Sequence, residues 1–138
     1  MSRSSQYASY KSLAPKDNTP KYNCISIQDH QHRKNILAEN HIVCIYLHAD
    51  WCEPCKVVSP LFSSIAQQYN NLGHCFLLKE NIELKLTKDI EITGIPAFIF
   101  YVKGQLLRNK DGSPVNVVGG DINKVKQILD NLIGPKSA

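Results

Sequence analysis

Apolar and polar positions follow two different periods along the chain, and their order predicts an α/β domain. Residues 42–47, Ile-Val-Cys-Ile-Tyr-Leu, form a continuous apolar run rich in β-branched residues, which is typical of a central strand covered on both faces. From Pro54 onward the apolar positions recur at spacings of three and four, which predicts an amphipathic helix that ends near residues 70–73. Apolar runs at 75–78 and 97–102 predict two more buried strands.

Weaker patterns fill the intervals between these elements. They predict a short strand at 22–27, a helix at 30–39 with Asp29 as N-cap, a short helix at 82–90, a strand at 105–107 after a turn at 103–104, a resumed strand pattern at 115–118, and a final helix capped by Asp121. The order β, α, β, α, β, α, β, β, α predicts a mixed central sheet of four to five strands with helices on both faces. In such a sheet, ligands bind at the carboxyl end of the central strand.

Length and composition favour one domain, which we place at residues 22–138, preceded by a polar tail at residues 1–21. A chain of 138 residues with 43% hydrophobic content supplies one core. Because its 16 basic residues are scattered, we expect no nucleic-acid partner. No apolar run is long enough for a membrane span and none at the start suggests a secretory signal, so we expect a cytoplasmic protein without membrane association. The Ser-, Lys- and Arg-containing tail leaves organellar import open, and a protein partner could order it.

The chain has five cysteines, and only Cys52 and Cys55 are close enough in sequence to suggest a dedicated pair. We expect Cys44 and Cys75, which lie in apolar runs, to be packing residues. Cys24 borders the tail and is a candidate for an exposed regulatory thiol. A zinc site would need two further ligands, and no second C-x-x-C or H-x-x-x-H motif is present, so we predict no metal and no cofactor. His48 is expected to face solvent.

The C-x-x-C spacing at a helix start allows a reversible disulfide between residues one turn apart. Backbone N–H groups and the positive end of the helix stabilise a thiolate there, which lowers the pKa of Cys52 from its ordinary value of about 8.5. Cys52 is therefore the expected nucleophile. Cys55, one turn into the helix and less exposed, is the expected resolving thiol. Pro54 suits the first helical turn and stiffens the loop.

Residues 49–56, Ala-Asp-Trp-Cys-Glu-Pro-Cys-Lys, resemble the active site of the thioredoxin family, whose pattern is W-C-G-P-C-K. Residues 93–98, Thr-Gly-Ile-Pro-Ala-Phe, match the second signature of that family, and the resemblance covers about residues 25–132. It implies a thioredoxin fold and a cis peptide bond between Ile95 and Pro96. It also implies a substrate groove formed by Trp51, Ile95, Pro96 and the loop around Gly119, although Gly120 is an alternative match for that glycine.

Several residues depart from the family pattern around the cysteines. Tyr46 stands where the family has a buried carboxylate that takes the proton of the resolving thiol, so we expect Cys55 to deprotonate slowly. Glu53 replaces the family glycine and adds negative charge together with Asp50, while Lys56 partly offsets it. We therefore expect a higher pKa for Cys52 than in ordinary members.

The resemblance also extends to one lysine outside the two motifs, and one segment of the chain departs from it. Lys79 matches the family lysine on the third strand. Residues 109–116 look like an insertion, which we expect to be a loop.

The resemblance implies a thiol-disulfide oxidoreductase that reduces protein disulfides through the Cys52 and Cys55 dithiol. Its electrons would come from a thioredoxin-reductase-like or glutathione-dependent donor. One alternative is a non-enzymatic or weakly active binding or assembly subunit of a larger complex, suggested by Tyr46 and the tail. A dithiol sensor or an isomerase-like oxidant is a further alternative, because Glu53 alters the loop that tunes the redox potential.

Overall fold

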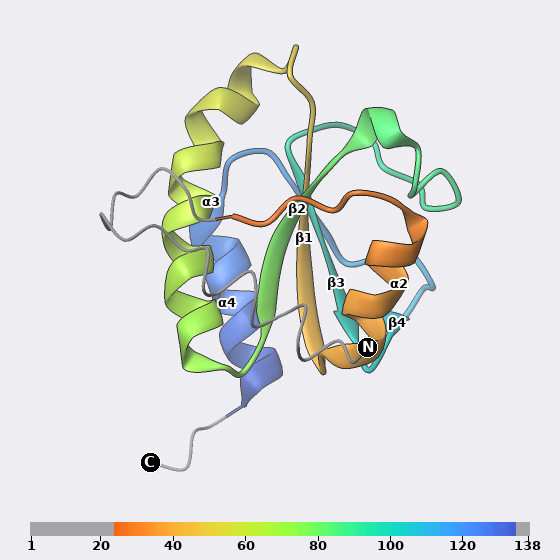
Figure 1. Ribbon diagram of the computed structural model, residues 1–138, viewed down its shortest axis with the longest axis vertical. Helices are drawn as coiled ribbons and strands as arrows, with labels where there is room; N and C mark the ends of the chain where they lie inside the picture. The colour runs from red at the N-terminus through yellow and green to blue at the C-terminus, as the bar shows by residue number, and fades with distance from the viewer. Residues whose placement is uncertain (1–23, 135–138) are drawn as a thin grey trace.

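A five-stranded mixed sheet organises residues 24–134, the part of the chain that the computed structural model describes (Figure 1). The predicted tail at residues 1–21 lies outside the described residues. In chain order the elements are α2 (His30–Glu39), β1 (Ile42–His48), α3 (Glu53–Leu72), β2 (Phe76–Asn81), the 3₁₀ helix η1 (Ile82–Leu84), β3 (Ala97–Val102), β4 (Gln105–Leu106), β5 (Asn116–Val118) and α4 (Ile122–Ile133).

Strand β1 lies in the middle of the sheet, as its continuous apolar run predicts. The strand order is β2-β1-β3-β4, and β5 pairs with β3 next to β4. β1 is parallel to β2 and antiparallel to β3, with Tyr46 opposite Lys79 on one side and Phe98 on the other. The mixed sheet predicted from the sequence is confirmed, and the carboxyl end of β1 leads directly into the loop before α3.

Alternate residues of β1 enter two separate cores because successive strand side chains point to opposite faces. Cys44 and Tyr46 belong to the core that faces α3 and α4, whereas Val43, Ile45 and Leu47 belong to the core that faces α2. Figure 1 shows α3 and α4 on one side of the sheet and α2 on the other, so the predicted placement of helices on both faces is confirmed. Burial on both faces explains why β1 lacks the polar alternation of a half-exposed strand.

The helix that carries the cysteines has well-defined ends. Cys52 is the N-cap of α3, and Gly73 ends the helix in the left-handed conformation with φ of 78°. Its buried residues recur at helical spacing, as predicted from the sequence: Val58, Phe62, Ile65, Ala66 and Tyr69. The predicted caps of the other two helices are also confirmed, because Asp29 accepts from the His32 N–H at 2.8 Å and Asp121 accepts from the Lys124 N–H at 3.1 Å.

Two short elements differ from their predictions. In the described part of the predicted 22–27 strand, a single bridge joins Ser26 to Lys79 in β2, and residues 22–23 lie outside the described part. The predicted helix at 82–90 is wrong beyond its first turn. Lys85 adopts φ of 58° and its N–H donates to Ile82 O at 3.0 Å, which ends the helix after one 3₁₀ turn.

The expected loop at 109–116 is in large part confirmed, because residues 109–113 form a turn, but its flanks pair as a hairpin. Leu107 N–H donates to Phe100 O at 2.8 Å and Val115 N–H donates to Leu107 O at 2.9 Å, so both arms continue the strand pattern. A bridge joins Arg108 to Pro114, and Asn116 already belongs to β5. The sequence pattern did not predict this hairpin, because Asp111 and the Gly-Ser-Pro that follows it interrupt the alternation of apolar residues.

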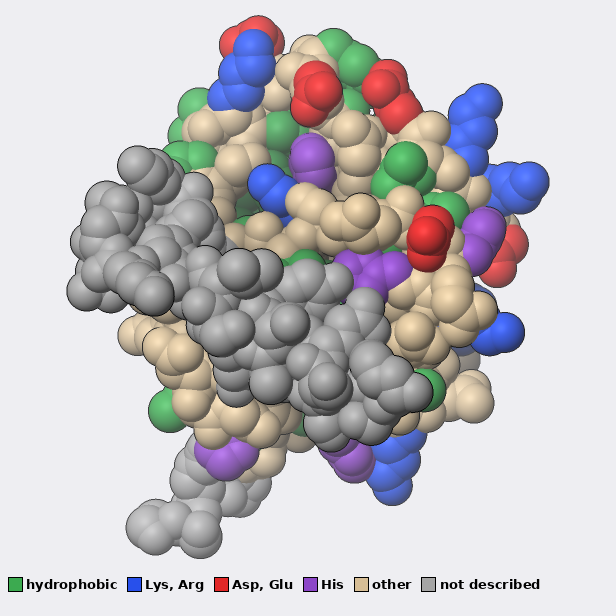
Figure 2. Space-filling model, viewed as in Figure 1, with side chains coloured by type: hydrophobic (Ala, Val, Ile, Leu, Met, Phe, Trp, Pro, Cys, Tyr) green, Lys and Arg blue, Asp and Glu red, His purple; other side chains and the backbone are tan. Residues whose placement is uncertain are grey.

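The part of the surface visible in Figure 2 carries both basic and acidic side chains. None of the helices in residues 24–134 is long and apolar enough to cross a membrane.

Candidate active site

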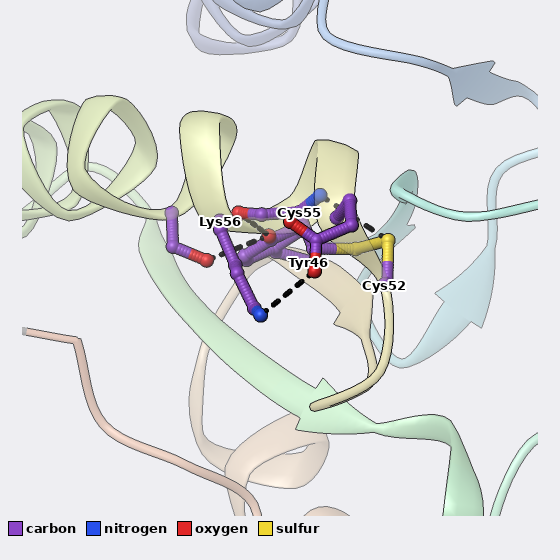
Figure 3. Close-up of a disulfide and its surroundings, with 6 residues drawn as sticks. Tyr46, Cys52, Cys55 and Lys56 are labelled. Atoms are coloured by element: carbon purple, nitrogen blue, oxygen red, sulfur yellow. Dashed lines mark hydrogen bonds and ion pairs between the residues drawn. A yellow bond between two sulfur atoms is a disulfide. The ribbon is translucent and has the colours of Figure 1, made fainter.

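Cys52 and Cys55 form a disulfide at the first turn of α3 (Figure 3). Their Cα atoms are 5.2 Å apart, and the Cys55 N–H donates to Cys52 Sγ at 3.2 Å. Cys52 therefore occupies the position at which a side chain accepts from an unpaired N–H group of the helix terminus. The same N–H group would stabilise a negative charge on Cys52 Sγ after reduction. The arrangement supports thiol-disulfide exchange.

Charged residues of the active-site loop lie on its exposed side. Lys56 Nζ contacts Glu53 Oε2 at 2.9 Å, and both side chains are exposed. Because this pair is in water, it partly cancels the charge of Glu53 and adds little stability. Asp50 is also exposed, and Pro54 lies in the first turn of α3 as predicted.

Tyr46 lies directly under the disulfide and is fully buried. Its hydroxyl donates to Cys55 O at 3.1 Å and lies 2.8 Å from Ser59 Oγ (Figure 3). Since the phenol has one proton and gives it to the carbonyl, the Ser59 hydroxyl is the donor in the second hydrogen bond. Burial raises the pKa of Tyr46, against the opposing effect of Ser59, so the phenol is neutral at physiological pH.

Packing holds the Tyr46 ring in place. It stacks on Phe98 with ring centroids 5.1 Å apart and contacts Phe62 at 5.0 Å. Tyr46 therefore presents a neutral hydroxyl from a packed ring beside the Cys55 carbonyl.

His48 and Lys79 border Tyr46 on the sheet. Lys79 is the β2 neighbour of Tyr46, and the His48 ring lies 5.4 Å from the Tyr46 ring. His48 faces solvent only in part, because its side chain is half-buried at the end of β1. Burial, with Lys79, lowers the pKa of His48 despite the opposing charge of Asp50.

The other three cysteines are free thiols that lie in the core or pack against it. Cys44 and Cys75 are buried, which confirms the packing role expected for them. Cys24 is partly buried against the same core cluster, and burial raises its pKa to about 12. Cys24 is therefore not the exposed thiol that its position beside the tail allowed, and a thiol at this pKa holds almost no thiolate at neutral pH.

Residues of the expected substrate groove come together around the disulfide. The Ile95–Pro96 peptide bond is cis, and Ile95 packs against the small cluster of Ala49, Cys52 and Cys55. Gly119 N–H donates to Pro96 O at 2.7 Å with φ of 102°, a conformation that favours glycine.

Sequence reasoning missed two residues of this site, Glu83 and Ser59. Trp51, which is 62% exposed, donates from Nε1 to Glu83 Oε2 at 2.7 Å. Glu83 lies 32 positions away and carries no motif that could have identified it. Ser59 was detectable, because it lies four residues after Cys55 and helical spacing brings such residues to one face.

No metal centre is present among the residues that the structure describes, since no group of three or more His, Cys, Asp or Glu side chains there could hold an ion.

This chain belongs to the thioredoxin family, whose family model matches residues 23–122. It is similar to Thioredoxin-T of Drosophila melanogaster, with 32% identity over 101 residues, which cover 72% of this chain and 59% of that protein. It is also similar to the thioredoxin of Neurospora crassa, with 24% identity over 77% of this chain and 84% of the relative. The match to Thioredoxin-like protein 1 of Schizosaccharomyces pombe spans only 28% of that relative.

Solved structures show the same fold. The thioredoxin of Malassezia sympodialis superposes with a TM-score of 0.68 at 22% identity, covering 82% of this chain and 96% of the other. Mitochondrial thioredoxin 3 of Saccharomyces cerevisiae has a TM-score of 0.65 at 20% identity, covering 78% of this chain and 94% of the other. The thioredoxin fold expected from the two sequence signatures is confirmed.

Proposed function

We propose that this protein is a thiol-disulfide oxidoreductase that reduces protein disulfides through Cys52 and Cys55. The observation that carries the proposal is the disulfide at the N-terminus of α3, with Cys52 as the N-cap. In the reduced protein, the Cys52 thiolate attacks a substrate disulfide, which forms a mixed disulfide and releases one substrate thiolate. Cys55, once deprotonated, attacks Cys52 Sγ and releases the second substrate thiolate, so two electrons pass to the substrate.

The surrounding residues take supporting roles in this proposal. Trp51, Ile95, Pro96 and Gly119 form the surface against which an extended substrate segment lies, in keeping with their positions beside the disulfide. Pro54 stiffens the loop.

Charged and polar neighbours tune the two thiols. Asp50 and Glu53 disfavour the Cys52 thiolate, and Lys56 offsets part of their effect. All three charges are exposed, so water and salt weaken their influence on the Cys52 pKa. Tyr46 contacts the Cys55 carbonyl, with Lys79 as its neighbour on β2, and the neutral phenol supplies no base for the proton of Cys55.

The oxidised pair must be reduced again before the next turnover. A thioredoxin-reductase-like protein or a glutathione-dependent donor would supply the two electrons. Such donors operate in a reducing compartment, for which the cytoplasm is our proposal.

An insulin-reduction assay tests the function. With dithiothreitol as electron source, the wild type is expected to accelerate precipitation of the insulin chains, and Cys52→Ser is expected to lose this acceleration. Cys55→Ser serves as the matched control, because it retains the nucleophile and should accumulate a mixed disulfide detectable by non-reducing electrophoresis. Equal rates for the wild type and Cys52→Ser would overturn the proposal and favour the binding-subunit alternative.

A further inference from the structure

A pocket of about 510 Å³ adjoins the disulfide on the side of Trp51. Trp51 and Ile95 form its boundary with the active site, and Ile82 lines it as well. Ile82 and Ile95 also pack against the cluster that contains Cys52 and Cys55, so the pocket wall and the disulfide share contacts. The hydrogen bond from Trp51 Nε1 to Glu83 Oε2, 2.7 Å long, holds the indole at this boundary.

The lining of the pocket combines apolar side chains with positive charge. Ile90 and Ile92 continue the apolar wall, and two exposed lysines, Lys85 and Lys88, complete the lining together with threonines. Neither lysine has an ion-pair partner among residues 24–134. These charges are therefore available to a bound molecule.

The lining of the pocket includes two lysines and no acidic side chain, although acidic groups lie nearby. Glu83 keeps its negative charge beside Trp51, because the indole that donates to it is neutral, whereas Glu53 is paired with Lys56 at 2.9 Å. Asp89 and Glu91 belong to the same segment of chain as the lysines but do not line the pocket.

We propose that this pocket binds an apolar residue of the substrate protein next to an acidic one, so that Lys85 and Lys88 direct the protein toward disulfides in acidic segments. The inference rests on the proposed function, because it assumes a substrate joined to Cys52. An extended chain advances about 3.3 Å per residue, so residues a few positions from the substrate cysteine reach the pocket. Apolar burial supplies affinity there, and charge complementarity supplies specificity.

Three peptide probes test the proposal. Each has one cysteine, present as a mixed disulfide with thionitrobenzoate and flanked on both sides by isoleucine and then by two Glu, two Gln or two Lys residues. Attack of the Cys52 thiolate on the peptide sulfur joins the peptide to Cys52 and releases coloured thionitrobenzoate. At low salt we expect the Glu peptide to react about fivefold faster than the Lys peptide, and this ratio should fall toward one in about 0.5 M NaCl.

Paired variants assign the preference to the pocket. Lys85→Glu/Lys88→Glu should reverse the order of the Glu and Lys peptides, and Lys85→Gln/Lys88→Gln should abolish it. Lys34→Glu/Lys110→Glu is the matched control, because it changes the net charge equally at two exposed lysines that do not line the pocket. This control should retain the preference. Circular dichroism of each variant verifies the fold.

The outcomes distinguish a failure of the pocket proposal from a failure of the proposed function. An unchanged Glu-to-Lys ratio in Lys85→Glu/Lys88→Glu, or an equal loss in the control pair, overturns the pocket proposal. Absence of any Cys52-dependent reaction with 5,5′-dithiobis(2-nitrobenzoate) overturns the proposed function instead. Rapid reaction with that reagent and with the Gln peptide, but no charge preference, leaves the function in place and rejects the pocket.

Discussion

At the scale of single residues, we expect Tyr46 to control how the proton of Cys55 can leave. The phenol contacts the Cys55 carbonyl at 3.1 Å, is fully buried and remains neutral because burial raises its pKa. A neutral phenol cannot accept a proton as a carboxylate does. Attack by Cys55 is therefore expected to be the slow step of substrate release.

Tyr46→Asp should accelerate that step. A carboxylate at this position accepts the Cys55 proton, and positioned general bases typically contribute about a hundredfold or more, so we expect at least about a tenfold gain near pH 7. Stoichiometric reaction of the reduced protein with 5,5′-dithiobis(2-nitrobenzoate) measures it. The first thionitrobenzoate reports the attack by Cys52 and the second reports the attack by Cys55, and only the second phase should become faster.

Tyr46→Phe is the matched control for this experiment. It removes the hydroxyl but retains the ring that packs on Phe98 and Phe62. The second phase should stay within about twofold of the wild type, while loss of the buried hydrogen bonds lowers the free energy of unfolding by about 1 kcal/mol. If Tyr46→Asp folds and its second phase is no faster than that of Tyr46→Phe, the proton of Cys55 does not limit release.

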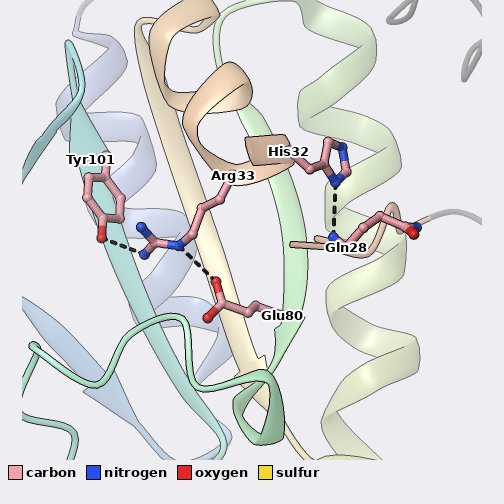
Figure 4. Close-up of polar contacts among 5 residues, drawn as sticks. All are labelled: Gln28, His32, Arg33, Glu80 and Tyr101. Atoms are coloured by element: carbon pink, nitrogen blue, oxygen red, sulfur yellow. Dashed lines mark hydrogen bonds and ion pairs between the residues drawn. The ribbon is translucent and has the colours of Figure 1, made fainter. Parts of the chain in front are cut away.

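At the scale of elements, a buried polar cluster joins α2 to β2 and β3 (Figure 4). Arg33 of α2 contacts Glu80 Oε1 of β2 at 3.0 Å and donates to the Tyr101 hydroxyl of β3 at 2.6 Å. Glu80 is fully buried, and its Oε2 atom has no hydrogen-bond partner among the described residues. Burial raises the pKa of Glu80, although Arg33 and His30 oppose the shift.

This cluster makes the stability of the fold depend on pH. A carboxyl whose pKa is raised on folding contributes stability below its unfolded pKa of 4.5 and loses that contribution as the pH rises through its folded pKa. Glu80→Gln keeps the shape and the acceptor for Arg33 but cannot ionise. The difference in unfolding free energy between Glu80→Gln and the wild type should therefore shift in favour of the variant from pH 4.5 upward.

Urea unfolding at several pH values between 4.5 and 8 measures this difference. Asp111→Asn is a suitable comparison, because Asp111 is an exposed hairpin residue whose pKa is lowered by its hydrogen bonds with Ser113. Its difference from the wild type should stay nearly constant over this range, because a lowered pKa changes the unfolding free energy only below the unfolded value of 3.8. A shift toward the wild type for Glu80→Gln would mean that the attraction of Arg33 outweighs the burial of Glu80.

At the scale of the whole molecule, the sequence predicted those features that depend on contacts close in the chain. Strand β1, helix α3 and the caps at Asp29 and Asp121 all follow from local periodicity and local hydrogen bonds. The two cysteines were predictable for the same reason, since one helical turn separates them.

Features that depend on distant contacts were not predictable from the pattern. The ion pair of Arg33 with Glu80 spans 47 positions, and the bond of Trp51 with Glu83 spans 32. The apolar residues at 82–90 mimic a helix, yet Leu86 is buried by tertiary packing after Lys85 has ended the turn. Their spacing determines neither the backbone conformation nor burial, because Leu84 is 43% exposed.

Deleting the hairpin at residues 108–114 tests whether this inserted segment stabilises the rest of the fold. Its hydrogen bonds are local: Asn109 N–H donates to Ser113 O at 2.8 Å, and Arg108 Nη1 donates to Gly112 O at 2.8 Å. Leu107 and Val115, which flank the segment, are already bonded to one another at 2.9 Å, so an Asn-Gly turn can join them directly.

Replacing residues 108–114 by Asn-Gly should leave the sheet and the disulfide chemistry intact. We expect the free energy of unfolding to change by no more than about 1 kcal/mol, because the removed side chains are exposed or only partly buried and a shorter loop costs less closure entropy. Urea unfolding and the insulin-reduction rate measure the two effects. A larger loss of stability, or a fall in insulin reduction with stability unchanged, would show that the hairpin supports β5 and, through Gly119, the position of Pro96.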